Sequence, residues 1–156
     1  MKLHEYQAKE ILRKYGVPTP KSQLAKTGSQ AATAAFDMGG TVVVKAQVHA
    51  GGRGKGGGIK LAKSIDEVRM HSESIIGMNL ITPQTSKEGK KVNQVLIAED
   101  VYYPGASEVE EYYISVLLNR SSAKNMIMYS SEGGMDIETV AEKTPELIHT
   151  LDVCPE

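Results

Sequence analysis

Residues Thr41 to Lys63 read TVVVKAQVHAGGRGKGGGIKLAK. This stretch starts with a β-branched run that contains Lys45, and a second apolar run begins at Ile59, so both ends have the pattern of strands. Between the two runs, six of the eight residues from 51 to 58 are glycine. The order predicts a strand that carries a lysine, a glycine-rich hairpin loop and a second strand.

The glycine-rich loop has the features of a phosphate-binding loop. Glycine adopts positive φ at little cost, so successive backbone N–H groups can point into one concavity, and such concavities bind anions. Residues 38–65 contain no Asp or Glu, and their cations are Lys45, Arg53, Lys55, Lys60 and Lys63. A flexible linker is the alternative that composition alone supports. The lysine inside the first strand and the single spacing of the loop cations favour phosphate binding.

Other phosphate-binding motifs fit this stretch less well. A P-loop needs Ser or Thr directly after Gly-Lys, but glycine follows Lys55 and lysine follows Lys90. A dinucleotide fingerprint needs a helix after its glycines, whereas here a strand pattern follows. A protein kinase carries its lysine on a strand after the loop, and Lys45 comes before it. Strand with lysine, glycine-rich hairpin and strand is the order found in ATP-grasp enzymes.

The amino-acid sequence of this stretch closely resembles that of one family of ATP-grasp enzymes, the β subunit of ADP-forming succinate–CoA ligase. The resemblance is carried by VVKAQVHAGGRGKGGG at 43–58, LHEYQAKEIL at 3–12, GVPTP at 16–20 and SSEGGMDIE at 130–138. It therefore runs along almost the whole chain. It implies an α+β fold of the ATP-grasp type, with two lobes and mixed or antiparallel sheets packed by helices.

The resemblance also implies a reaction. In that family, succinate, CoA and ATP give succinyl-CoA, ADP and phosphate in the tricarboxylic acid cycle, through a phosphohistidine on a partner α subunit. The β subunit holds ATP with Mg²⁺, whose Asn and Asp ligands are expected beyond residue 156. No catalytic residue and no metal ligand is therefore assigned to this chain. Two alternatives stay open: a CoA ligase for another acid, such as malate or citrate, and a nucleotide-binding module without turnover.

The nucleotide phosphates are expected at Lys45 and at the loop residues Gly52, Arg53 and Gly54. Strand alternation places Lys45 on the opposite face from the apolar residues Val42 and Val44. A lysine in a strand often extends its ammonium into water, so a solvated side chain is the alternative. Its apolar neighbours and its position just before the loop favour contact with a phosphate.

The base and ribose of the nucleotide are expected near the acidic stretch that follows. Residues 92–119 contain no Lys or Arg, and a Tyr-Tyr-Pro-Gly turn from residue 102 suggests a hinge. A carboxylate can accept hydrogen bonds from a ribose, while hinge backbone groups can read a base edge. The residues alone favour a solvated acidic loop, whereas the resemblance makes Glu99, Tyr102 and Glu111 candidates. Ala98 is an alternative to Glu99, and Glu108 or Glu110 to Glu111.

Composition bounds the class of protein. The chain has 156 residues with 40% hydrophobic and 24% charged residues, which is typical of a globular domain. A net charge of −1 argues against a nucleic-acid binder. No apolar run reaches the roughly 18 residues of a membrane span, and no secretory or transit segment is recognised. Cys154 is the single cysteine, which favours a reducing compartment. The resemblance to the ligase family implies a bacterial cytoplasmic location.

The remaining elements follow from periodicity and capping signals. Helices are predicted over 3–15, 31–38, 65–76 and 136–143, with capping boxes at Thr27 with Gln30 and at Ser64 with Glu67. Further strands are predicted over 92–99, 112–119, 125–130 and 146–151, and residues 120–124 are expected to close an antiparallel hairpin. Residues 82–91 are predicted to be a loop. The first domain is expected over 1–100, with the N-terminal helix and the first lobe. The second, over 101–156, is expected to be the beginning of another lobe.

Overall fold

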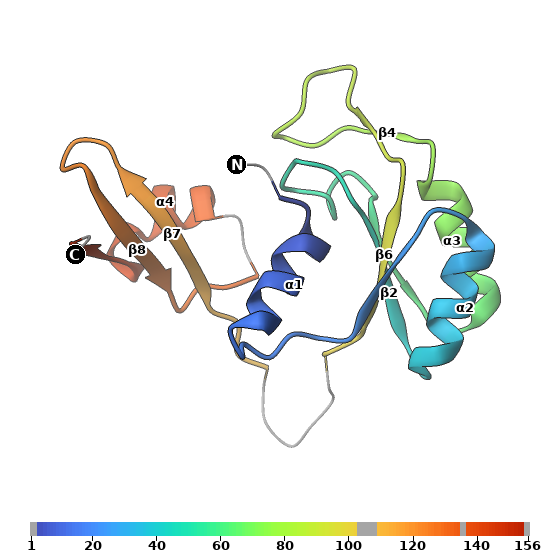
Figure 1. Cartoon of the computed structure of the whole chain (residues 1–156). Coiled ribbons are helices and arrows are strands. Elements are labelled where there is room, and N and C mark those ends of the chain that lie inside the picture. The colour runs from blue at the N-terminus through green and yellow to red at the C-terminus, as the bar shows by residue number, and fades with distance from the viewer. Residues whose placement is uncertain (1–2, 103–108, 135–136, 155–156) are drawn as a thin grey trace. The chain divides into compact units, whose positions relative to one another are not determined.

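The computed structural model describes residues 3–102, 109–134 and 137–154. The chain divides into two compact units, Met1–Tyr102 and Tyr103–Glu156 (Figure 1). The first unit is built on a four-stranded antiparallel sheet with helices, and the second on a three-stranded antiparallel sheet. This arrangement agrees with the predicted α+β class. That the two units act as the lobes predicted over 1–100 and 101–156 stays a prediction.

The main sheet of the first unit has the strand order β1-β6-β2-β3. Its strands are β1 Ser22–Ala25, β6 Val95–Glu99, β2 Val42–Ala46 and β3 Ile59–Ala62, and every neighbouring pair is antiparallel. The β2–β3 pair is joined by the glycine-rich stretch, which confirms the predicted strand–loop–strand order. β1 was not predicted, because its four residues SQLA show little β-propensity and are held by pairing with β6.

Two helices, α2 (Gly28–Met38) and α3 (Ile65–Ile75), cover one face of this sheet (Figure 1). Val42, Val44 and Ala46 of β2 are fully buried and belong to the same apolar cluster as residues of both helices. Val43 and Lys45 are only partly buried, as expected for alternate residues of a strand whose two faces differ. The predicted alternation of β2 is therefore confirmed, and Lys45 lies on the face away from α2 and α3.

The helix starts agree with their predicted capping residues. Thr27 Oγ1 accepts a hydrogen bond from the Gln30 N–H at 3.2 Å, and Ser64 Oγ accepts one from the Glu67 N–H at 3.2 Å. α2 begins at Gly28, three residues before its predicted start, because a residue that caps a helix stands directly before the first turn. Helix α1 spans Glu5–Lys14.

A small two-stranded ladder lies between α3 and β6. It pairs β4 (Asn79–Leu80) with β5 (Lys90–Lys91). The prediction of a loop up to residue 91 was therefore wrong at its end, because two lysines give no strand pattern and pairing alone defines β5. Leu80 is fully buried in the core of the unit, so this ladder fixes the segment on which the glycine-rich loop rests.

The second unit contains β7 (Tyr113–Asn119), β8 (Lys124–Ser130) and β9 (Ile148–Val153) in that spatial order. The predicted β7–β8 hairpin is confirmed. Helix α4 spans Ile137–Lys143, and a 3₁₀ turn, η1, spans Pro145–Leu147. The last strand starts two residues later than predicted, because the proline opens this turn. The first residue of the predicted 136–143 helix lies outside the described residues.

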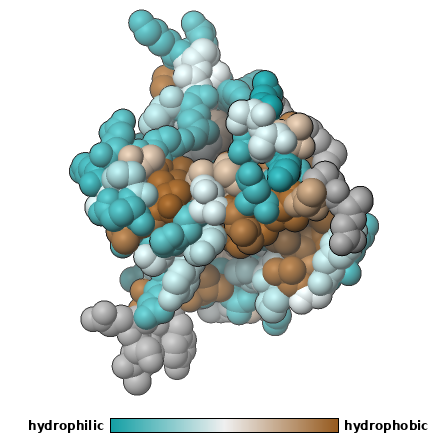
Figure 2. Space-filling model, turned by 90° about the vertical axis from the view of Figure 1, so that its left-hand side faces the viewer, coloured by the Kyte–Doolittle hydropathy of each residue, from teal (hydrophilic) through white to brown (hydrophobic). Residues whose placement is uncertain are grey.

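One face of β7 is apolar and exposed. Ile114, Val116 and Leu118 are 73%, 71% and 63% exposed, and as alternate residues they share a face. Figure 2 shows brown apolar side chains among polar ones on the face that it draws. Within the described part of the chain, no helix has the length and apolar character needed to cross a bilayer.

Candidate functional site

The glycine-rich loop between β2 and β3 folds back on itself. The N–H groups of residues 56–58 donate to the carbonyls of residues 52–54 over 2.8 to 3.2 Å. The N–H of Gly51 donates to Gln84 Oε1 at 2.7 Å. These four donors are used inside the protein and are not available to an anion.

Close packing explains the glycines in the second half of the loop. A Cβ on Gly58 would lie 2.9 Å from Leu80 Cδ2, and one on Gly56 would lie 2.9 Å from Leu80 Cδ1 and closer still to the Ile81 carbonyl oxygen. Real Cβ atoms do not approach other atoms so closely. The loop therefore rests on the segment at Leu80 and Ile81, and only glycine allows this approach.

The two predicted phosphate-loop glycines differ in backbone conformation. Gly52 has φ +68°, and a Cβ there would lie 3.1 Å from Pro83 Cδ. Gly54 is outside the left-handed region, and a Cβ there would have Ile59 Cδ1 as its nearest neighbour, at 4.0 Å. Of these two glycines, therefore, only Gly52 has the left-handed backbone that favours glycine.

We expect Gly52→Ala to weaken nucleotide binding by about five- to thirty-fold. The left-handed conformation costs a residue with a Cβ roughly 1–2 kcal/mol, so the loop shifts away from its present path. Gly39→Ala is the matched control, because Gly39 has the same φ of +68°, an added Cβ there meets nothing within 4 Å, and the residue is not assigned to the nucleotide, so the expected change in ATP affinity is below about twofold. The measurement is calorimetric titration of ATP; equal affinities of the two variants would contradict the prediction.

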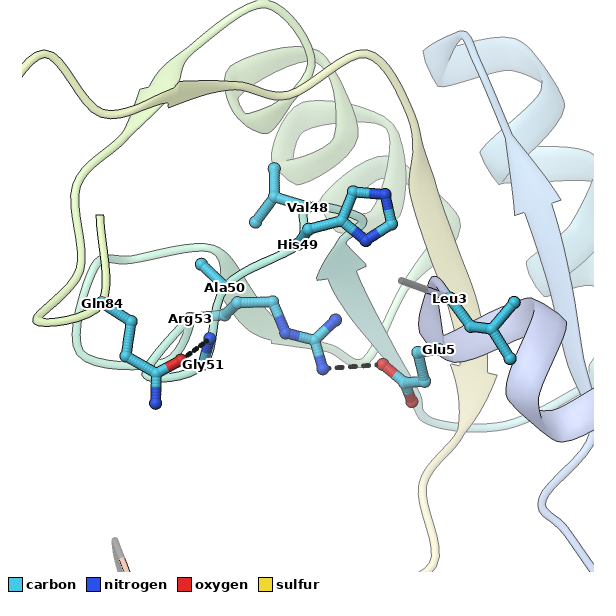
Figure 3. A pocket seen from close by; sticks show the side chains of 8 residues that line it. All are labelled: Leu3, Glu5, Val48, His49, Ala50, Gly51, Arg53 and Gln84. Atoms are coloured by element: carbon cyan, nitrogen blue, oxygen red, sulfur yellow. Dashed lines mark hydrogen bonds and ion pairs between the residues drawn. The ribbon is translucent and has the colours of Figure 1, made fainter. Parts of the chain in front are cut away.

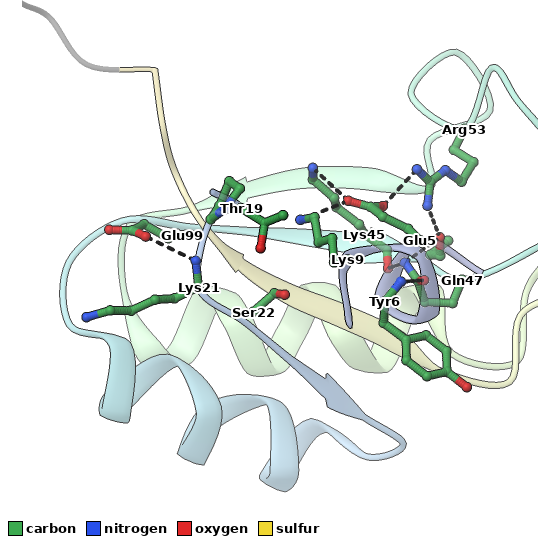
Figure 4. A network of polar contacts seen from close by, with 12 residues as sticks. Glu5, Tyr6, Lys9, Thr19, Lys21, Ser22, Lys45, Gln47, Arg53 and Glu99 are labelled. Atoms are coloured by element: carbon green, nitrogen blue, oxygen red, sulfur yellow. Dashed lines mark hydrogen bonds and ion pairs between the residues drawn. The ribbon is translucent and has the colours of Figure 1, made fainter. Parts of the chain in front are cut away.

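Lys45 and Arg53 meet at one carboxylate, that of Glu5 in the first turn of α1 (Figure 4). Lys45 Nζ lies 3.3 Å from Glu5 Oε1, and an Arg53 guanidinium nitrogen lies 2.9 Å from Glu5 Oε2. Lys9, one helical turn along α1, lies 3.2 Å from Glu5 Oε1. The Glu5, Lys45 and Arg53 side chains are only 19%, 27% and 20% exposed, so this cluster is more shielded from solvent than an ordinary surface ion pair.

The charges in this cluster control the protonation of Glu5. Burial by itself would raise the pKa of the Glu5 carboxyl, but the charges of Lys45, Arg53 and Lys9 outweigh burial and lower that pKa from 4.5 to about 2. Glu5 is therefore ionised throughout the physiological pH range. The cluster contains three cations and one anion, so it keeps an excess of positive charge that suits a polyphosphate.

We expect the stabilising effect of Glu5 to disappear in acid. Since its pKa is lower in the folded protein than in the unfolded chain, the contribution is complete above pH 4.5 and is lost as the pH falls toward 2. Relative to Glu5→Gln, the wild type should gain on the order of 1–2 kcal/mol at pH 6, after allowance for partial solvent screening. The measurement is urea unfolding from pH 6 to pH 2.5; a gap between the two proteins that does not change with pH would contradict this prediction.

A pocket of about 430 Å³ opens beside the start of the loop (Figure 3). Glu5, Arg53, Gly51 and Gln84 are among the residues that line it. His49 also lines it, and its ring stacks on that of His4 at a centroid distance of 3.9 Å. The pocket thus joins the loop, its arginine and the first turn of α1 in one concavity.

His4 and His49 stack on each other just before the loop. Lys90 Nζ donates to the His49 carbonyl at 2.6 Å, and burial lowers the pKa of His4, with further lowering from His49 and Arg53. A neutral imidazole at His4 stacks on His49 without adding another charge beside Arg53. Lys90 thus bonds the backbone of His49, and the His4 ring packs on the His49 ring just before the loop.

The predicted base contacts lie at the other end of the β2–β6 pair. Glu99 pairs with Val42, three residues before Lys45 and thus about 10 Å along the strand from it. The Glu99 carboxylate accepts a hydrogen bond from the Lys21 N–H at 3.2 Å. Ala98 pairs with Val43 and so shares the face of Lys45, but it is buried. The Glu99 N–H also bonds inside the protein, to the Lys21 carbonyl at 2.9 Å, so the contact that Glu99 or Ala98 would make with a base stays a prediction.

The other predicted contacts have different surroundings. Tyr102 is 61% exposed, and its N–H donates to Asp100 Oδ1 at 3.1 Å. Glu111 belongs to the second unit, where its carbonyl accepts from the Gly133 N–H at 2.9 Å. Glu110 accepts from the Tyr112 hydroxyl at 2.7 Å, and Glu108 lies outside the described residues. The structure thus brings Lys45 and Arg53 together, and the ribose partner stays a prediction.

Sequence reasoning missed Glu5, which is 40 residues from Lys45 in the chain. An acid in the first turn of a helix reads as a partner of the helix dipole. One signal pointed toward such a residue: residues 38–65 carry five cations and no acid, so a counter-ion for the buried ones has to come from elsewhere.

Metal ligands do not gather in the described ranges of the chain. Within residues 3–102, 109–134 and 137–154, no three His, Cys, Asp or Glu side chains are close enough together to hold a metal ion. The residues at the loop therefore offer cations and backbone donors for phosphates, and no carboxylate set for Mg²⁺.

An antiparallel lobe with a glycine-rich hairpin, and a strand lysine beside it, defines a protein of the ATP-grasp class. The family described as "ATP-grasp domain" matches residues 2–156, and the chain belongs to this family. The predicted fold class is therefore confirmed.

Curated relatives at about 60% identity are β subunits of one ligase. The chain is 61% identical over 160 residues to the succinate–CoA ligase [ADP-forming] subunit β of Christiangramia forsetii, and 59% identical to that of Flavobacterium johnsoniae. Each alignment covers 99% of this chain and 40% of the relative. The resemblance recognised in the sequence is confirmed, and the chain spans about 40% of the length of these relatives.

Solved structures agree on the fold. The protein PH1788 from Pyrococcus horikoshii matches with a TM-score of 0.68 at 22% identity, covering 99% of this chain and 60% of that one. The ACD1 protein of Candidatus Korarchaeum cryptofilum, solved in complex with coenzyme A, matches with a TM-score of 0.64 at 23% identity. It covers 96% of this chain and 58% of that one. At these identities the likeness concerns the fold alone.

Proposed function

We propose that this chain is the nucleotide-binding part of the β subunit of a succinate–CoA ligase. The observation that carries the proposal is the meeting of Lys45 and Arg53, from β2 and the glycine-rich loop, beside a 430 Å³ pocket. Arg53 stands in the loop between Gly52 and Gly54, and it lines this pocket together with Glu5. This arrangement suits the phosphates of ATP, and the identity of about 60% to ADP-forming succinate–CoA ligases supports the choice of reaction.

The proposed nucleotide lies along β2, with its phosphates at the loop and its base toward the end of β6. Lys45 and Glu99 are about 10 Å apart along the strand pair, which is similar to the separation of phosphates and base in an extended nucleotide. We assign Lys45, Gly52, Arg53 and Gly54 to the phosphates, and backbone groups at Glu99 and Tyr102 to the base. Glu111 is proposed for the ribose.

The proposed reaction forms succinyl-CoA, ADP and phosphate from succinate, CoA and ATP, in the tricarboxylic acid cycle of the cytoplasm. This chain would bind and orient ATP, and a partner α subunit would supply the histidine that carries the phosphoryl group. Mg²⁺ would neutralise phosphate charge. Within the described residues, no three His, Cys, Asp or Glu side chains gather to hold a metal ion, and no ligand of Mg²⁺ is assigned among them.

The proposal is tested with the full-length β subunit, purified together with its α subunit. Thioester formation from CoA and ATP should be at least about tenfold faster with succinate than with malate or citrate at equal concentration. Faster turnover with malate or citrate would support a CoA ligase for another acid. ATP binding without thioester formation from any of the three acids would support a non-catalytic nucleotide-binding module.

We expect ATP to bind at least about tenfold more tightly than GTP. The opening GVPTP, with Pro20, resembles ADP-forming members of the family, and the relatives are named as ADP-forming enzymes. The measurement is competitive displacement of a labelled ADP by each nucleotide in the full-length subunit. Equal displacement by ATP and GTP would show that the purine is not selected.

A further inference from the structure

Glu5 uses both of its carboxylate oxygens on the cations of the proposed phosphate site (Figure 4). Oε1 accepts from Lys45 Nζ at 3.3 Å and also lies 3.2 Å from Lys9 Nζ. Oε2 accepts from Arg53 at 2.9 Å. One side chain of α1 therefore fixes the positions of a strand lysine and a loop arginine that are eight residues apart.

Helix α1 is hydrogen-bonded to the residue that follows β2, and this bond holds the backbone beside Glu5 in place. Gln47 is 3% exposed, and its Oε1 accepts from the Tyr6 N–H at 3.4 Å. The Gln47 Nε2 donates to the Lys45 carbonyl at 3.3 Å. Tyr6, which follows Glu5, is thus bonded to Gln47, which follows β2. This bond keeps the Glu5 carboxylate beside the Lys45 ammonium.

Arg53 connects the loop to the same point. One guanidinium nitrogen donates to the Ala46 carbonyl at 2.9 Å, and the other bonds Glu5 Oε2 at 2.9 Å. The side chain spans the last residue of β2 and the first turn of α1. Because the backbone of Arg53 belongs to the loop, this fork holds the loop against both elements.

We propose that Glu5 is a positioning residue of the nucleotide site, which holds Lys45 and Arg53 where the phosphates bind. The proposal rests on the function proposed above. Glu5 does not touch the nucleotide: it acts through the two cations and, by way of Arg53, on the loop. The N-terminal helix is then part of the nucleotide site rather than a separate covering element.

If Glu5 had a different role, its neutralisation would change ATP affinity in the opposite direction. If Glu5 merely competed with phosphate for the two cations, its neutralisation would remove a competing anion and tighten ATP binding. If Glu5 positions them, its neutralisation leaves two like charges side by side without their shared partner, and they move apart. The loop then loses its attachment to α1, and ATP binds more weakly.

The first experiment compares Glu5→Gln with Glu10→Gln in the full-length β subunit. The control makes the same chemical change at an exposed residue of the same helix. Calorimetric titration should show ATP affinity at least about fivefold lower for Glu5→Gln, and within about twofold of wild type for Glu10→Gln. Affinity that is unchanged or higher in Glu5→Gln would overturn the proposal, provided that thermal unfolding shows the variant to be folded.

The second experiment needs no nucleotide. Trypsin cleaves after Arg53 and Lys55, which lie in the loop, so the rate of cleavage there reports how firmly the loop is held. Glu5→Gln should be cleaved in the loop at least about fivefold faster than wild type. Arg53→Lys keeps the positive charge but loses the two guanidinium nitrogens that bond the Ala46 carbonyl and Glu5. This variant should also be cleaved faster than wild type, after residue 53 or after Lys55.

The two experiments separate this proposal from the proposed function. If wild type does not bind ATP but Glu5→Gln still speeds loop cleavage, the proposed function fails and the positioning of the loop by Glu5 stands. If wild type binds ATP and Glu5→Gln leaves the cleavage rate unchanged, the positioning role is overturned even if ATP affinity falls.

Discussion

Lys45→Ala is expected to weaken ADP binding by about ten- to over a hundred-fold. A charge-assisted hydrogen bond to a phosphate contributes roughly 1.5–3 kcal/mol, and the variant removes it. The Lys45 side chain is 27% exposed and is held beside the loop by Glu5 at 3.3 Å, so little ordering is needed when a phosphate arrives. Glu5 keeps Arg53 and Lys9 as partners in this variant, which limits the cost to the fold.

The measurement is calorimetric titration of ADP into the full-length subunit. Lys63→Ala is the matched control, because this lysine is exposed just after β3, and its removal should change affinity by less than about twofold. Adenosine, which has no phosphate, should bind wild type and Lys45→Ala equally. An affinity ratio for ADP below about threefold, ~0.65 kcal/mol, would return Lys45 to the solvated alternative.

Local patterns predicted the centre of the fold well. β2, the glycine-rich loop and β3 are consecutive in the chain, so their hairpin depends on strand propensity and on turn chemistry that a short stretch contains. The capping residues Thr27 and Ser64 also act within one helical turn. Each of the two strands and each capping pair is specified by residues fewer than ten positions apart, and both strands are found where their patterns indicated.

Contacts between distant segments were beyond the sequence. β1 and β5 are strands because of their partners, and their own residues give no strand pattern. Glu5 joins the site across 40 residues, and a single sequence does not record which acid meets which cation. The reason that Gly56 and Gly58 are glycine is equally remote, since it is the approach of Leu80.

At the end of β6, where the base is proposed to bind, the alternation of side chains along the strand leaves two candidates, Ala98 and Glu99. Neighbouring residues of a strand lie on opposite faces, so Ala98 and Glu99 cannot both face the nucleotide. Register places Ala98 on the Lys45 face, while the Glu99 carboxylate bonds the Lys21 N–H. A backbone contact does not depend on which side chain points inward, but the Glu99 N–H already donates to the Lys21 carbonyl and the Asp100 N–H to the Thr41 carbonyl.

Leu80→Ala is expected to destabilise the first unit by about 2–5 kcal/mol. Leu80 is fully buried in the main core, and its two methyl groups lie directly under Gly56 and Gly58 of the loop. Truncation leaves a cavity that the rigid hairpin above it cannot easily fill. The N–H groups of residues 56–58, which bond within the loop, should therefore exchange with solvent faster than in wild type.

Leu61→Ala is the matched control for this variant, since Leu61 lies on β3 and is 47% exposed. It removes the same atoms with an expected cost below about 1 kcal/mol, because no closed cavity is left. Urea unfolding gives the two costs, and hydrogen exchange of the loop amides locates the effect. If Leu80→Ala lowers stability while the loop amides keep their protection, Leu80 supports the core but not the loop, and the glycines at 56 and 58 need another explanation.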